Sequence, residues 1–199
     1  MDRRLKNKGE WDDEPDMQLL SRLHEMLSTN PAAALSGLKE LASRGSRMSM
    51  NYIGEAYRKG LGTPIDISQS TEWYRRATEA GSVRASYEVG RNYLDIQDFG
   101  KALDAFSLGV AKEYSPSLNM LGTMHMEGSG VPVDLGKARE LFERAASQGH
   151  FFSKRHLAYL LMKGKFGFWR RPKGVLLLLS AMKDMFMVVL RDPLSDRLR

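Results

Sequence analysis

Apolar and polar residues alternate with a helical period over most of the chain, and glycine and proline interrupt the period at regular places. Between residues 116 and 149, the segment PSLNMLGTMHME has helical spacing, the loop GSGVPV breaks it, and a second helical pattern opens after Asp134. The apolar positions of this second pattern recur at the spacing of a core-facing helix: Ala138, Leu141, Phe142, Ala145 and Ala146. The segment predicts a helix, a turn and a helix, with Asp134 as the N-cap of the second helix and Gly149 as its left-handed end.

The same pattern recurs before and after this segment. Residues 51–81 align on it with an offset of 68, which places Gly54 on Gly122 and Tyr74 on Phe142. A shorter copy lies between the two, another follows, and a degenerate copy covers residues 17–45. The equivalent positions 54, 90, 122 and 158 are 36, 32 and 36 residues apart. A period of this length is typical of stacked helical repeats, so we predict an all-α protein of about five helix pairs.

The two clearest copies carry a family resemblance. The segments GSGVPVDLGKARELFERAASQG and GLGTPIDISQSTEWYRRATEAG resemble the Sel-1-like repeat, a relative of the tetratricopeptide repeat. The resemblance covers roughly residues 31–182 and is partial at both ends. It implies a right-handed α-solenoid that acts as an adaptor, with the inner helices lining a concave surface. Some cysteine-rich relatives act on cell-wall-like compounds, but this chain has no cysteine and departs from them.

The expected domain organisation is a single solenoid domain between two polar tails. We expect a flexible N-terminal tail at 1–14, the solenoid at 15–190 and a basic C-terminal tail at 191–199. Pro15 is expected to open the first helix, while Pro31 opens the second and Gly45 ends it. The start MDRRLKNKGEWDDEPD has no apolar core of a secretory signal, so the expected location is cytoplasmic, with a peripheral membrane contact left open.

One face of the first helix of each pair is expected to line the concave surface, if the family geometry holds. The candidate partner-binding residues on this face are Asn51, Glu55, Arg58, Tyr87, Arg91, Asn119, Thr123, Arg155, Tyr159 and Met162. Tyrosine and arginine are enriched in interface hot spots, and methionine adapts to varied ligands. The mixture favours capture of a peptide or helical segment of a protein partner. The alternative interpretation is an ordinary solvated face.

The recurrent glycines and aromatic residues predict packing and no chemistry. Gly54 and Gly122 lie inside helices, where glycine costs about 1 kcal/mol against alanine, so a close approach between helices is the expected compensation. The loop glycines at 60, 62, 128 and 130 resemble part of a phosphate loop, but no GKS or GKT follows them. Tyr74 and Phe142 are expected in the core between neighbouring helices.

The chain has no recognisable catalytic motif. HExxH and GxSxG are both missing from the sequence, and His150 and His156 are six residues apart, which puts them on different faces of a helix. We therefore predict a non-catalytic protein without a metal or cofactor. An enzyme acting on cell-wall-like material is the weakest alternative and depends on the family resemblance alone.

The basic character of the chain is concentrated at its C-terminal end. From residue 154 onward there are eleven Lys or Arg against three Asp or Glu, a balance of +8 where the whole chain carries +6. The candidate anion-binding residues are Trp169, Arg170, Arg171 and Lys173, at the start of a predicted helix. They suggest an alternative function as a peripheral regulator on an anionic membrane or a phosphate group. The competing interpretation is that the aromatic residues cover the end of the solenoid and the cations are solvated. No recognition-helix motif accompanies the positive charge, which disfavours nucleic acid.

The last predicted helix, at 174–190, is unusually apolar. Its segment VLLLLSAMKDMFMVVL carries Lys183 and Asp184 at the centre, which argues against a membrane-spanning helix. Three roles remain open for it: it caps the solenoid, forms a homo-oligomer interface, or touches a membrane surface.

Overall fold

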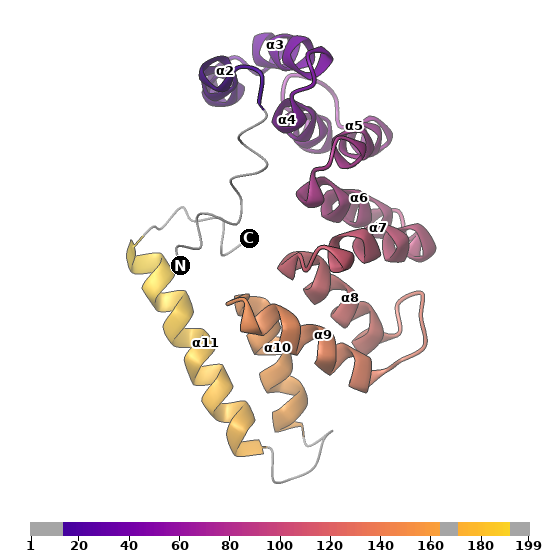
Figure 1. Ribbon diagram of the computed structural model, residues 1–199, viewed down its shortest axis with the longest axis vertical. Coiled ribbons are helices and arrows are strands. Elements are labelled where there is room, and N and C mark those ends of the chain that lie inside the picture. Colours follow the sequence, from indigo (N-terminus) through magenta and orange to yellow (C-terminus); the bar gives the residue numbers. More distant parts are fainter. Residues whose placement is uncertain (1–13, 164–170, 192–199) are drawn as a thin grey trace. The chain divides into compact units, whose positions relative to one another are not determined.

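The computed structural model describes residues 14–163 and 171–191. In these residues the chain forms ten helices and no strand (Figure 1). It divides between Asp98 and Phe99 into two compact units. The helices of the first unit are α2 (Met17–Thr29), α3 (Pro31–Ser43), α4 (Arg47–Lys59), α5 (Ile67–Glu79) and α6 (Val83–Asp95). The helices of the second unit are α7 (Phe99–Ala111), α8 (Ser115–Glu127), α9 (Leu135–Ser147), α10 (Phe151–Met162) and α11 (Arg171–Arg191).

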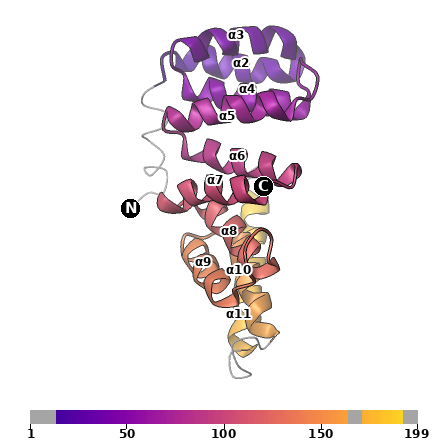
Figure 2. The same ribbon diagram turned by 90° about the vertical axis from the view of Figure 1, so that its right-hand side faces the viewer.

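Within each unit, consecutive helices pack on one another in the order of the sequence. In the first unit α2 packs on α3, α3 on α4, α4 on α5 and α5 on α6, and Figure 2 shows the helices of this row side by side. In the second unit the same holds from α7 to α11. This nearest-neighbour packing is that of a helical-repeat solenoid. The predicted all-α repeat fold is confirmed, and the number of helices in the described residues agrees with about five pairs.

Aspartate side chains cap three helices, of which the repeat pattern predicted the caps at Asp66 and Asp134. The side chains of Asp16, Asp66 and Asp134 accept hydrogen bonds of 2.9, 2.9 and 2.8 Å from the backbone N–H three residues further on. Such a cap contributes about 1 kcal/mol because it satisfies an otherwise unpaired amide. The first helix begins at Met17, two residues later than expected from Pro15, because Asp16 is the capping residue.

The last residue of the predicted N-terminal tail is bound to the first unit. The Glu14 carboxylate accepts hydrogen bonds from Ser46 Oγ at 2.5 Å and from the backbone N–H of Met48 at 2.9 Å, at the start of α4. The remainder of that predicted tail, residues 1–13, lies outside the described residues, as do residues 192–199 of the predicted basic tail.

The second glycine of each repeat loop is required by close packing. Gly62 and Gly130 both have positive φ, at 68° and 73°. A Cβ on Gly62 would lie 2.5 Å from the carbonyl carbon of Pro31 at the start of α3, and a Cβ on Gly130 would overlap Phe99 at the start of α7. The loop after α4 therefore packs on the start of α3, and the loop after α8 packs on the start of α7. This close packing explains the glycines that resemble part of a phosphate loop.

Glycines inside α4 and α8 let the second helix of the repeat approach. A Cβ on Gly54 would lie 3.0 Å from the ring of Tyr74, and a Cβ on Gly122 would lie 2.7 Å from Phe142 Cε1. Tyr74 and Phe142 are both buried. The predicted close approach is confirmed, and the large ring fills the space that the glycine leaves.

The helix α11 packs on α10 along one face only (Figure 1). Ala181 is fully buried, and Leu177 packs against the cluster that contains Leu157 and Leu160. The opposite face is apolar and exposed, so packing on α10 explains the apolar residues on only one of the two faces of α11. No helix in the described part of the chain is long and apolar enough to cross a lipid bilayer.

Candidate functional site: two equivalent helix faces

Each unit contains one face built by equivalent residues. The offset of 68 that relates the repeats places α4 on α8 and α6 on α10. Asn51 Nδ2 on α4 donates a hydrogen bond of 3.1 Å to Ser82 Oγ, which caps α6. Ser153 Oγ on α10 donates one of 2.9 Å to Asn119 Oδ1 on α8. We call these the first-unit face (α4 and α6) and the second-unit face (α8 and α10). Each contains five of the ten predicted binding residues.

Two of the predicted residues are not available to a partner. Asn51 is 4% exposed and Asn119 is 8% exposed. Both amides hydrogen-bond across to the neighbouring helix, and Asn119 Oδ1 also lies 3.1 Å from His156 Nδ1, which must carry the proton because an amide oxygen only accepts. The prediction of an accessible side chain is wrong at these two positions, which join the helices of each face.

The charges of the first-unit face are neutralised within the face. Arg58 donates to Glu88 at 3.2 Å and to Asp95 at 2.8 Å, and Arg91 contacts the same Glu88 oxygen at 3.2 Å. The Arg58 and Glu88 side chains are only 16% and 11% exposed. The Tyr87 ring lies beneath the Arg91 guanidinium, with 5.8 Å between the ring centroid and Cζ. Burial raises the pKa of the Tyr87 hydroxyl. The arrangement holds α4 against α6.

Glu55 is also paired within the first-unit face. Burial by itself would raise the pKa of this carboxyl, but the hydrogen bond from Lys59 at 2.6 Å and its positive charge lower it. Glu55 therefore stays ionised at neutral pH, and its carboxylate already has a cationic partner, Lys59, on the same helix.

The second-unit face presents an aromatic and cationic ridge along α10. Arg155 stacks over the ring of Phe152 at 5.2 Å, and Lys163, just after the helix, lies 5.6 Å from the ring centroid of Tyr159. Tyr159 is 52% exposed and Met162 is 39% exposed. We call Phe152, Arg155, Tyr159, Met162 and Lys163 the α10 ridge. Among the described residues, no carboxylate lies within salt-bridge distance of Arg155 or Lys163.

The remaining predicted residue of this face, Thr123, contributes mainly to its own helix. Its hydroxyl donates a 3.0 Å hydrogen bond to the backbone carbonyl of Asn119, and the residue is half-buried. It can border a bound segment without supplying a free donor.

The two faces share their geometry and differ in charge. At three equivalent positions, the first-unit face has a carboxylate and the second-unit face has none. These pairs are Glu55 and Thr123, Glu88 and His156, and Asp95 and Lys163. Because the acids are replaced, the cations of the α10 ridge have no carboxylate partner in the part of the chain that the structure describes, whereas Arg58 and Arg91 of the first-unit face form ion pairs within that face. Sequence registration alone does not show this, since it does not tell which charges are paired.

A histidine caps α10. His150 Nδ1 accepts a hydrogen bond of 3.3 Å from the backbone N–H of Ser153, at the position where serine caps α6. Burial, and then the charge of His156, lowers the pKa of His150 to about 4, and burial also lowers the pKa of His156. Both rings are therefore neutral at pH 7 and serve as hydrogen-bonding groups. The described residues contain no group of three or more side chains placed to hold a metal ion.

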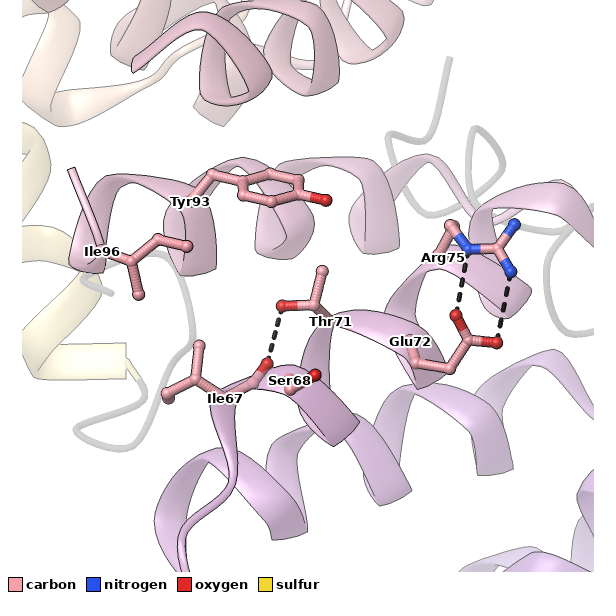
Figure 3. Close-up of a pocket in the computed structure, with 7 residues that line it drawn as sticks. All are labelled: Ile67, Ser68, Thr71, Glu72, Arg75, Tyr93 and Ile96. Atoms are coloured by element: carbon pink, nitrogen blue, oxygen red, sulfur yellow. Dashed lines mark hydrogen bonds and ion pairs between the residues drawn. The ribbon is translucent and has the colours of Figure 1, made fainter. Parts of the chain in front are cut away.

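A cavity of about 370 Å³ lies between α5 and α6 in the first unit (Figure 3). Ile67 and Ile96 supply apolar walls, while Glu72 and Arg75 form an ion pair of 3.1 Å at one side. Ser68, Thr71 and Tyr93 complete the lining. The cavity can hold an apolar side chain against the two isoleucines. Sequence reasoning did not select these residues, because the space depends on how α5 and α6 diverge.

The predicted anion site falls mostly outside the described residues. Trp169 and Arg170 lie outside them, and Arg171 is the first residue of α11, with a side chain that is not described. Lys173 is exposed in the first turn of that helix. Anion binding at these four residues stays a prediction.

The fold defines a class, the α-helical repeat solenoids, in which consecutive helices pack on one another. The Sel1 repeat family model matches residues 47–82 and 115–150, which are the two repeats related by the offset of 68. These two segments match the Sel1 repeat, so the predicted resemblance to the Sel-1-like repeat family is confirmed. Proteins of this family generally mediate protein–protein interactions and generally act as non-enzymatic scaffolds.

Individual relatives agree with this family. A sel1-like repeat-containing protein of Acanthamoeba polyphaga mimivirus is 27% identical over 129 residues, which are 65% of this chain and 24% of that protein. The crystal structure of c5321, a protective antigen of uropathogenic Escherichia coli with an SLR fold, is similar with a TM-score of 0.72 and 22% identity, over 83% of this chain and 38% of that one. A Sel1 repeat protein of Oxalobacter formigenes gives a TM-score of 0.66 at 23% identity, over 76% and 62% of the two chains. The matched regions thus span a quarter to less than two thirds of these relatives.

Proposed function

We propose that the chain is a non-catalytic interaction scaffold that binds an acidic peptide or helical segment of a partner protein along the α10 ridge. The observation that carries this proposal is the pair of cations Arg155 and Lys163, on either side of the half-exposed Tyr159, which have no carboxylate partner among the described residues. A bound carboxylate would complete the charge pairing that the first-unit face already has within itself.

The chemistry of the ridge supports an acidic segment with an apolar anchor. Arginine and tyrosine are enriched among hot spots, where truncation typically costs about 2 kcal/mol or more. Tyr159 and Met162 are one turn apart on α10, so an aromatic or aliphatic side chain of the partner can lie on them while its carboxylates approach the flanking cations. Charge complementarity of this kind contributes to specificity and association rate.

The first-unit face is proposed as a secondary contact surface of the scaffold. Its remaining predicted residues are Glu55, Arg58, Tyr87 and Arg91. Because three of them are engaged in ion pairs, they offer a neutral surface with less binding energy per residue. The α10 ridge is therefore proposed as the principal site.

The test is peptide selection on the purified full chain. A displayed random peptide library is selected on the wild-type chain, and the affinity of the selected peptides is then measured for wild type and for the two single variants Arg155→Glu and Tyr159→Ala. Enriched peptides are expected to be acidic with an aromatic or aliphatic anchor, and to bind more weakly as ionic strength rises. Arg155→Glu should weaken a selected peptide by about tenfold or more, which corresponds to about 1.4 kcal/mol.

Lys112→Glu is the matched control, because Lys112 is an exposed cation of the same unit away from α10. It makes the same change of net charge and should leave peptide affinity within about twofold. Equal loss in Lys112→Glu and Arg155→Glu would show that only net charge matters. Selected peptides that bind Tyr159→Ala as well as wild type would place the site elsewhere.

A further inference from the structure

The helix α11 is held in one rotational setting by its contacts with α10. Gly174 lies so close to α10 that a Cβ there would be 2.8 Å from Met162 Cγ and 3.0 Å from the carbonyl oxygen of Ala158. Further along, Ala181 is fully buried and Asp184 pairs with Lys154. The other face of the helix is consequently turned away from α10.

That other face carries an apolar stripe with heptad spacing. Val175, Leu179, Met182 and Phe186 follow one another at intervals of four, three and four residues. They are 45%, 56%, 52% and 61% exposed, and Leu176 beside them is also exposed. Alternating intervals of four and three are those of the a and d positions of a coiled coil, which pack against another helix. We call these four residues the α11 stripe.

The α11 stripe is complementary to itself when a second helix runs antiparallel. A two-fold axis between residues 180 and 181 brings Leu179 opposite the partner's Met182. The same axis brings Val175 opposite the partner's Phe186, so each layer combines a smaller side chain with a larger one. Lys183 then lies beside the partner's Leu176, which its aliphatic part can cover. Parallel pairing would instead align Phe186 with Phe186 of the partner subunit and the like charges of Lys183 at one level, with the helix dipoles unfavourably aligned.

The size of the surface also fits a second copy. Five large apolar side chains that are about half exposed present on the order of 100 Å² each, if a full side chain is about 150–250 Å². Two copies together then contribute about 1,000 Å², the size at which specific interfaces begin. The stripe is narrow, whereas a helix that lies on a lipid surface has a broad apolar arc opposite a strongly charged one.

We propose that the protein forms a homodimer through the α11 stripe, with two α11 helices packed antiparallel about a two-fold axis between residues 180 and 181. The α10 ridge and the α11 stripe involve different residues, so dimer formation does not require the proposed peptide site.

Sedimentation equilibrium of the full chain over a micromolar concentration series tests the dimer. Wild type is expected to approach twice the monomer mass of 22.5 kDa. Leu179→Glu introduces two charges into each interface and should raise the dimer dissociation constant by at least about 100-fold. The matched control is Leu108→Glu on α7, since Leu108 is 57% exposed and lies off α11. It should leave the dissociation constant within about threefold.

Disulfide trapping tests the orientation, because the natural chain has no cysteine. A mixture of Val175→Cys and Phe186→Cys chains should crosslink between the two different chains, and Val175→Cys alone should not. In the antiparallel pair, the two Val175 positions are eleven residues apart along the axis, or about 16 Å. Self-crosslinking of Val175→Cys would refute the antiparallel arrangement.

Two further outcomes would overturn the dimer itself. One is a wild-type chain that stays monomeric throughout the series. The other is equal weakening by Leu179→Glu and Leu108→Glu. If the monomeric chain floats with phosphatidylcholine and phosphatidylserine vesicles and Leu179→Glu abolishes flotation, the stripe binds lipid and the dimer proposal is rejected. Circular dichroism confirms that each variant is folded.

Discussion

Replacing Gly122 by alanine changes the contact between α8 and α9 by one methyl group, and two opposing effects decide the result. In a helix interior the replacement is favourable by about 1 kcal/mol, because alanine has fewer unfolded conformations to lose. In the folded chain the new methyl group would lie 2.7 and 2.9 Å from two ring carbons of Phe142. The optimum between such carbon atoms is about 3.5–4.0 Å, so the contact is repulsive.

The surroundings of Phe142 make the repulsion difficult to relieve. The ring is fully buried and belongs to a cluster with Leu157 and Leu160. Overpacking of this kind costs about 1–3 kcal/mol, and a ring that is enclosed on all sides belongs at the upper end. Set against the gain of about 1 kcal/mol from helix propensity, Gly122→Ala should be destabilising by about 1–2 kcal/mol.

Urea unfolding followed by far-UV circular dichroism measures this change. The matched control is Gly136→Ala in the first turn of α9, where the glycine is exposed and a Cβ would meet only Asp134 Oδ1, at 3.3 Å. The control should be neutral or stabilising by up to about 0.5 kcal/mol. A second check is Gly122→Ala in a Phe142→Leu background, where the cost should fall by about 1 kcal/mol because ring atoms have been removed. Equal stability of Gly122→Ala and Gly136→Ala would refute the close-approach argument.

Three further predictions concern the caps and the buried ion pair. Asp134→Ala should lower the unfolding free energy by about 1 kcal/mol in urea titration, and Asp134→Asn should recover most of it, because asparagine also caps. His150 has a folded-state pKa of about 4 against 6.5, so its contribution is fully present above pH 6.5 and is lost as the pH falls toward 4. The variant His150→Ser keeps a capping oxygen but has no imidazole to protonate. Between pH 6.5 and pH 4 it should therefore lose about 2–3 kcal/mol less unfolding free energy than wild type, as measured by thermal unfolding at a series of pH values. The same loss in both chains over this pH range would contradict the prediction. Arg58→Ala leaves Glu88 buried without its main partner and should lower the unfolding free energy by about 2 kcal/mol or more. Arg75→Ala removes an exposed ion pair and should change the unfolding free energy by no more than about 0.5 kcal/mol. Equal effects of the two variants in urea titration would show that burial of the pair is unimportant.

Much of the fold was predictable because its signals are local. An aspartate that caps three residues ahead, or a glycine that ends a helix with positive φ, acts within a few residues, and the repeat brings the same signals back at a fixed interval. Asp66 and Asp134 therefore have the same role, as have Gly54 and Gly122. Pro15 was misassigned because Asp16, a stronger start signal, lies next to it.

The candidate site was predictable only in part. Registration grouped the candidate residues on α4, α6, α8 and α10, since equivalent residues of a repeat share a face. It could not distinguish Asn51 and Asn119, which hydrogen-bond to the neighbouring helix, from Tyr159, which is exposed on α10. All three side chains carry a hydrogen-bonding group, and only the distance to the next helix decides whether that group is buried in a contact between helices.

The amino-acid sequence by itself determined the helical repeat, its caps and its turns, because these follow from interactions between residues close in the chain. The tertiary structure alone decided which charges are neutralised and which apolar face of α11 stays exposed. Pairing of Arg58 with Glu88 and burial of Ala181 depend on contacts between helices that are some twenty to thirty residues apart in the chain. Such contacts exist only once the helices have packed, so neither could be read from the order of residues.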